Sequence, residues 1–131
     1  MNHKDYYTAL GQLVYSIAMA DGSIQNEEVS KVFHFVVSQI VELESESGNG
    51  RDALKAFYTE KEFHRMKNEN IPVDEAYQRF IVFIEKNKND LNDKLKTTCI
   101  NLMEKVAVAY NGIEDAEMAI IEKVKKRIVE L

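Results

Sequence analysis

The amino-acid sequence predicts an all-α fold, and three observations support this prediction. Apolar residues recur at intervals of three and four through most of the 131 residues, which is the spacing of one helix face. The chain holds one proline and five glycines, so residues that break helices are scarce. No window alternates between apolar and polar residues for long enough to indicate a strand. We expect residues 1–131 to form one domain, because domains of this size are common. The expected architecture is a bundle of about seven helices.

The first two helices are expected from about Lys4 to Ala20 and from Glu27 to about Glu44. An apolar stripe marks the first, formed by Leu10, Leu13, Val14, Ile17 and Ala18. A wider one marks the second, formed by Val29, Val32, Phe33, Val36, Val37, Ile40 and Leu43. The segment Ser47–Arg51, SGNGR, ends the second helix because two glycines around an asparagine indicate a loop.

Two short helices are expected between Asp52 and Asn70. The sequence TEKE at Thr59–Glu62 is a capping-box pattern, in which the Glu62 side chain reaches back to the Thr59 amide. It predicts that one short helix ends before Thr59 and that another begins there.

Three longer helices complete the prediction. Pro72 breaks the chain before a helix over Val73–Lys88, and the unbroken apolar run Phe80–Ile84 predicts that this helix is central. A further helix is expected over Leu91–Ala109, and the last begins at about Asp115.

The two ends of the chain are related by an ungapped offset of 89 residues. Leu13 matches Leu102, Ile17 matches Val106, Ala20 matches Ala109, Ile24 matches Ile113, and Glu28 matches Glu117. Two related helical hairpins, Lys4–Glu44 and Leu91–Leu131, are therefore expected to pack together, with Val73–Lys88 between or across them. The residues expected to be most buried are Val32, Val36, Phe80, Val106 and Ile121.

The repeated segments, AMADGSIQNEE and its degenerate copy AVAYNGIEDAE, resemble the TerB-like tellurite-resistance family. The copy departs from the pattern where Tyr110-Asn111-Gly112 replaces Asp21-Gly22-Ser23. The resemblance implies an all-helical bundle of bacterial origin that is linked to resistance against tellurite and other chemical stress. It also implies a cytoplasmic module that binds protein partners, some of them membrane-bound, and an acidic surface that holds metal ions. It brings no catalytic residues.

Two interpretations of the segment from Ala20 to Glu28 stay open. In a calcium-binding loop with Gly22 at position 6, the first ligand positions fall on Ile17 and Met19, which offer no side-chain oxygen. A working calcium loop is thereby excluded. Either Gly22 ends one helix and Asn26 caps the next, or carboxylates hold a weakly bound divalent cation. The predicted ligands of that cation are Asp21, Glu28 and Glu117, with Glu27 and Asp115 nearby.

Composition and motifs exclude several other classes of function. The net charge is −5 and basic residues are spread along the chain, which argues against a nucleic-acid binder. No signal peptide or transmembrane helix is expected, which predicts a cytoplasmic protein without membrane insertion. Cys99 stands in an apolar context and is expected to be a buried small hydrophobe. Glu60 and His64 have the spacing of two zinc ligands, but no further ligands complete a site, so a solvated helix face is favoured.

These observations predict a non-catalytic interaction module without a firmly bound cofactor. The alternative is a metal-dependent enzyme whose carboxylates converge inside the bundle. Helical di-metal sites use Glu-x-x-His pairs, and this sequence contains none. The sequence leaves the oligomeric state open.

Overall fold

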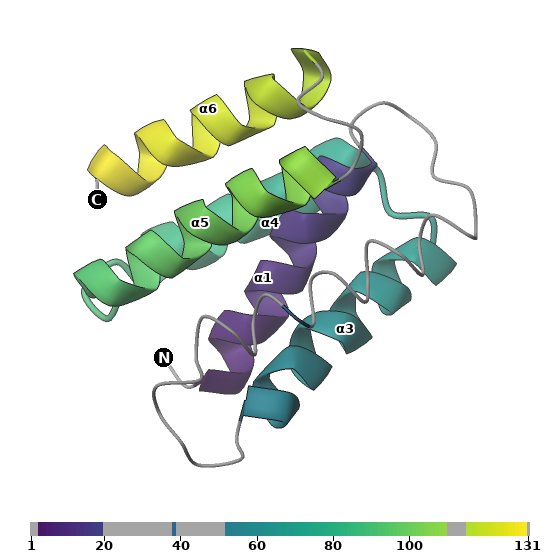
Figure 1. Ribbon diagram of the computed structural model, residues 1–131, viewed down its shortest axis with the longest axis horizontal. Helices are drawn as coiled ribbons and strands as arrows, with labels where there is room; N and C mark the ends of the chain where they lie inside the picture. The colour runs from purple at the N-terminus through teal and green to yellow at the C-terminus, as the bar shows by residue number, and fades with distance from the viewer. Residues whose placement is uncertain (1–2, 20–37, 39–51, 110–114, 131) are drawn as a thin grey trace.

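The computed structural model describes residues 3–19, 38, 52–109 and 115–130, and Figure 1 shows how the helices are arranged. These ranges contain five α-helices: α1 (His3–Ala18), α3 (Asp52–Asn68), α4 (Val73–Lys86), α5 (Asp93–Ala109) and α6 (Asp115–Glu130). They contain no strand, so the predicted all-α class is confirmed for this part of the chain. The predicted helix over Glu27–Glu44 lies outside the described residues. None of the described helices is long and apolar enough to cross a membrane.

The central helix of the bundle is α1, which contacts α3, α4, α5 and α6. Its predicted apolar stripe is buried. Further side chains around its circumference are buried as well: Tyr6, Tyr7, Ala9, Tyr15 and Ser16. The prediction that α4 is central is wrong, because Val82 in its apolar run is 59% exposed. An unbroken run of apolar letters does not require that every one of them is covered.

The helix α3 is continuous where two short helices were predicted. Thr59 lies inside it, and its hydroxyl donates a hydrogen bond of 2.7 Å to the carbonyl oxygen of Tyr7 in α1. The predicted capping box at Thr59–Glu62 is therefore wrong, because the threonine side chain serves a contact between helices. Together with the five helices of the described ranges, this leaves the predicted count of about seven unconfirmed.

The contact between α1 and α3 is close at Gly11. A β-carbon added there would lie 2.6 Å from the carbonyl oxygen of Thr59 and 2.9 Å from the Glu62 β-carbon. Both distances are shorter than ordinary contacts, so only glycine lets the two helices approach this far. Tyr15 and Phe63 add an edge-on ring contact, with centroids 5.9 Å apart.

The end of α3 is set by Asn70, whose φ of 52° lies in the left-handed region. The Ile71 amide donates to the Met66 carbonyl oxygen, and the Asn70 amide donates to that of Lys67. This pair of bonds is the Schellman arrangement, which asparagine tolerates. The extended Pro72 then starts α4, as the sequence predicts.

The C-terminal helices start at or near their predicted positions. Because Asn92 caps α5, with its Oδ1 accepting from the Leu95 amide at 2.9 Å, this helix begins two residues after the predicted Leu91. α6 begins at Asp115 as expected. The two helices pack against each other, and both contact α1.

The predicted core is confirmed in part. Phe80 and Ile121 are 1% and 2% exposed, which confirms two of the five residues expected to be most buried. Val32 and Val36 lie outside the described residues, and the burial of Val106 stays a prediction. The same holds for the packing of the two complete hairpins, since only the first helix of the N-terminal one is described.

Candidate functional site

The predicted cation site falls mostly outside the described residues. Asp21, Glu27 and Glu28 belong to the stretch from 20 to 37, which the structure does not describe. Asp115 and Glu117 lie in the first turn of α6. Whether these carboxylates converge is therefore untested, and the site stays a prediction.

The described residues contain no group of three or more His, Cys, Asp and Glu side chains that could hold a metal ion. Glu60 and His64 are one turn apart on α3, as their spacing indicates. The His64 ring lies edge-on to Phe63, with centroids 6.2 Å apart. This is consistent with the ordinary helix face that the sequence favours for the pair.

Cys99 is 3% exposed and lies on α5 within the apolar core. Burial raises the pKa of its thiol to about 12, because the thiolate would lose its hydration. A thiol in this state is a poor nucleophile. The prediction of a buried small hydrophobe is confirmed.

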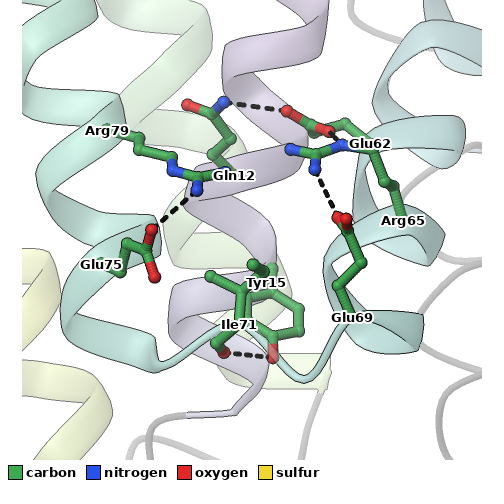
Figure 2. A network of polar contacts seen from close by, with 8 residues as sticks. All are labelled: Gln12, Tyr15, Glu62, Arg65, Glu69, Ile71, Glu75 and Arg79. Carbon is green, nitrogen blue, oxygen red and sulfur yellow. Dashed lines mark hydrogen bonds and ion pairs between the residues drawn. The ribbon is translucent and has the colours of Figure 1, made fainter.

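A polar cluster lies where α3 and α4 flank α1, and we call its members Gln12, Glu62, Arg65 and Glu69 the α1–α3 polar cluster (Figure 2). Glu62 is 7% exposed, and its carboxylate accepts one bond from the Gln12 amide at 2.8 Å and one from the Arg65 guanidinium. Arg65 also donates to Glu69 one turn later. The side-chain bond to Glu62, with a smaller contribution from Glu69, raises the pKa of Arg65.

The chemistry of this cluster is that of a clamp between helices. A nearly buried carboxylate is stable when hydrogen-bond donors satisfy it, and Glu62 has two, the neutral Gln12 amide of α1 and the charged Arg65 guanidinium of α3. Beside it, the Tyr15 hydroxyl donates to the Ile71 carbonyl oxygen at 2.6 Å and ties α1 to the turn before α4. These hydrogen bonds hold α3 and the turn before α4 in place against α1.

Sequence reasoning missed this cluster, although part of its signal is visible. The spacing of Glu62, Arg65 and Glu69 allows pairs on one helix face. The partner Gln12, however, stands 50 residues away from Glu62 in the chain. Local patterns carry no information about such a partner.

A second set of charges joins α6 to its neighbours. Lys125 pairs with Glu104 of α5, Arg127 pairs with Glu85 of α4 at 2.8 Å, and the Lys123 ammonium lies 5.9 Å from the centre of the Tyr77 ring. The hydrogen bond to Glu104 raises the pKa of Lys125. The segment Glu122–Arg127 is thus a largely solvated face, as expected, but these three contacts reach across to other helices.

Comparisons with protein-family models, with curated proteins and with solved structures give no match for this chain. The resemblance to TerB-like proteins therefore stays a prediction from the repeated segment. In its described part, the molecule is an all-α bundle around a buried first helix.

Proposed function

We propose that this chain is a TerB-like helical module that acts by binding protein partners and not by catalysis. The observation that carries this proposal is the sequence pattern that recurs at an offset of 89 residues, which predicts a helix–turn–helix unit with an acidic helix start in both copies. In this proposal the module works in the bacterial cytoplasm within a response to tellurite or other chemical stress. Its partners are proteins of that system, some of them associated with the membrane.

Two features of the described residues support a binding module over an enzyme. The interior around α1 is filled by apolar side chains that form one continuous cluster. The nearly buried acid Glu62 accepts bonds from Gln12 and Arg65, which a structural role explains fully. A module of this kind presents its surface to partners and uses its interior for stability.

The test of partner binding is affinity capture from the native organism with the full chain as bait, with and without tellurite exposure. The matched control is Leu13→Asp, which places a charge at a fully buried site and unfolds the bait. We expect proteins that bind the wild type and not the control, and that then form a stoichiometric complex when purified. If wild type and control capture the same proteins, the proposal fails.

The alternative, a metal-dependent function of Asp21, Glu28 and Glu117, is tested separately by thermal unfolding. We expect that millimolar Ca²⁺ or Mg²⁺ leaves the Tm of the wild type unchanged, because capping alone explains these residues. Asp21→Asn is compared with Asp74→Asn, a change at an exposed residue of α4. An ion-dependent rise in Tm that Asp21→Asn abolishes and Asp74→Asn retains would replace the capping interpretation with a cation site.

A further inference from the structure

The helix α6 is held by a narrow apolar stripe. Among its side chains from 118 to 130, three are buried, namely Ile121, Val124 and Ile128. Spacings of three and four residues place them on a single face. Of its other large apolar side chains, Met118 and Val129 are 38% and 80% exposed, and Ile120 is partly buried against the core. Most of the circumference of this helix therefore faces solvent.

The charged contacts of α6 lie at the rim of this stripe. In the pair of Lys125 and Glu104 the side chains are 36% and 47% exposed, and in that of Arg127 and Glu85 they are 52% and 45% exposed. Pairs this exposed contribute little to stability and are weakened by salt. They can nevertheless favour one position of the helix over another.

The contacts between α1 and α3 are buried, in contrast to the exposed ion pairs of α6. There the hydrogen bond from Thr59 to the Tyr7 carbonyl oxygen is buried, and the helices touch at Gly11. Figure 1 shows α3 and α6 on different sides of the bundle, so α6 can leave without disturbing this contact. Regions with fewer buried contacts open at lower free energy than the rest of a protein.

We propose that α6 is a strap, which undocks as one unit from α1, α4 and α5 while those helices stay folded. Undocking exposes the stripe of Ile121, Val124 and Ile128 together with the apolar surface beneath it. The rim pairs with Glu85 and Glu104 add a small contribution to the docked state, so ionic strength shifts the population of the open state. This inference does not depend on the proposed partner-binding function.

Native-state hydrogen exchange of the full chain, resolved by residue, tests the proposal. We expect the amides of α6 to exchange at least about tenfold faster than those of α1, because they need only a local opening. The screening length falls severalfold when KCl is raised from about 0.02 M to about 0.5 M. This change is expected to accelerate the amide exchange of α6 and to leave the exchange of α1 unchanged. Equal protection of the two helices would overturn the proposal.

Charge variants separate the rim pairs from a general salt effect. Glu85→Gln combined with Glu104→Gln is expected to raise the exchange rate of α6 roughly fivefold, since each exposed pair contributes little, and to leave α1 unchanged. The matched control is Glu75→Gln, which removes a pair with Arg79 inside α4. If the double variant accelerates the amide exchange of α1 and α6 equally, or changes the exchange of neither helix, the assigned role of the rim pairs is wrong.

Discussion

The helices α3 and α6 both pack against α1, but they do so by different means. The contact of α3 combines a helix approach that only glycine permits with a buried hydrogen bond and a nearly buried carboxylate. The contact of α6 combines a stripe of three aliphatic side chains with solvated ion pairs. The difference shows that one small bundle can hold one helix by specific buried contacts and another by general hydrophobic burial. Four experiments test this difference.

The largest effect is expected at Leu13, which is fully buried in α1. Leu13→Ala should lower the free energy of unfolding by about 3 kcal/mol, because it removes buried methyl groups and leaves a cavity. Val129→Ala, at an exposed site of α6, should change it by less than about 0.5 kcal/mol. Urea unfolding measures both. Similar losses in the two variants would contradict the burial of Leu13 and the exposure of Val129.

The next effect is expected at Gly11. Gly11→Ala gains about 1 kcal/mol of helix propensity, but its β-carbon meets the backbone of α3 at Thr59. We expect a net loss of about 2 kcal/mol, because overpacking against a backbone forces the helices apart. The control Thr97→Ala, which places alanine at an exposed position of α5, should not lower the free energy of unfolding. A more stable Gly11→Ala variant would show that the close approach is dispensable.

A smaller effect is expected from Tyr15→Phe, which removes the bond to the Ile71 carbonyl oxygen. The loss should be about 1 kcal/mol at neutral pH. Burial raises the pKa of the Tyr15 phenol. The unfolded tyrosine therefore loses its proton first, and the stability that this group contributes is present below about pH 10 and is lost above it. Alkaline unfolding curves should show a weaker pH dependence for Tyr15→Phe than for the wild type.

The smallest effect is expected at the rim of α6. A double-mutant cycle of Arg127→Gln and Glu85→Gln should give a coupling of at most about 0.5 kcal/mol, because both side chains are half exposed. The coupling should disappear in about 1 M KCl, where screening is nearly complete. A coupling above about 1.5 kcal/mol that survives in salt would place this pair among the specific contacts, beside those of α3.

The sequence predicted the helices well where one face alone is buried, since periodicity reports a face directly. Ile121, Val124 and Ile128 of α6 follow such a stripe, and so does the buried face of α4 around Phe80 and Ile84. It was less informative for α1. There Tyr6, Tyr7 and Tyr15 are buried outside the predicted stripe, because neighbouring helices cover more than one side.

The errors arose where a local pattern had a distant partner. The letters at Thr59 and Glu62 fit a capping box, yet Thr59 contacts Tyr7 and Glu62 contacts Gln12, and both of these partners are about 50 residues away. No local rule distinguishes a threonine that caps its own helix from a threonine that hydrogen-bonds to a different helix. The candidate cation site at Asp21, Glu28 and Glu117 stays a prediction, because convergence of side chains depends on tertiary structure.

The order of α1 before α5 in the chain has a consequence for how this bundle forms during synthesis. The Tyr6 hydroxyl of α1 donates to the carbonyl oxygen of Leu95 in α5, which is synthesised 89 residues later. The burial of α1 is therefore complete only after α5 has been synthesised, and non-local contacts of this kind slow folding. Until α3, α4 and α5 have emerged, part of the apolar surface of α1 is uncovered in the nascent chain. It is then in the state in which nascent proteins aggregate or engage chaperones.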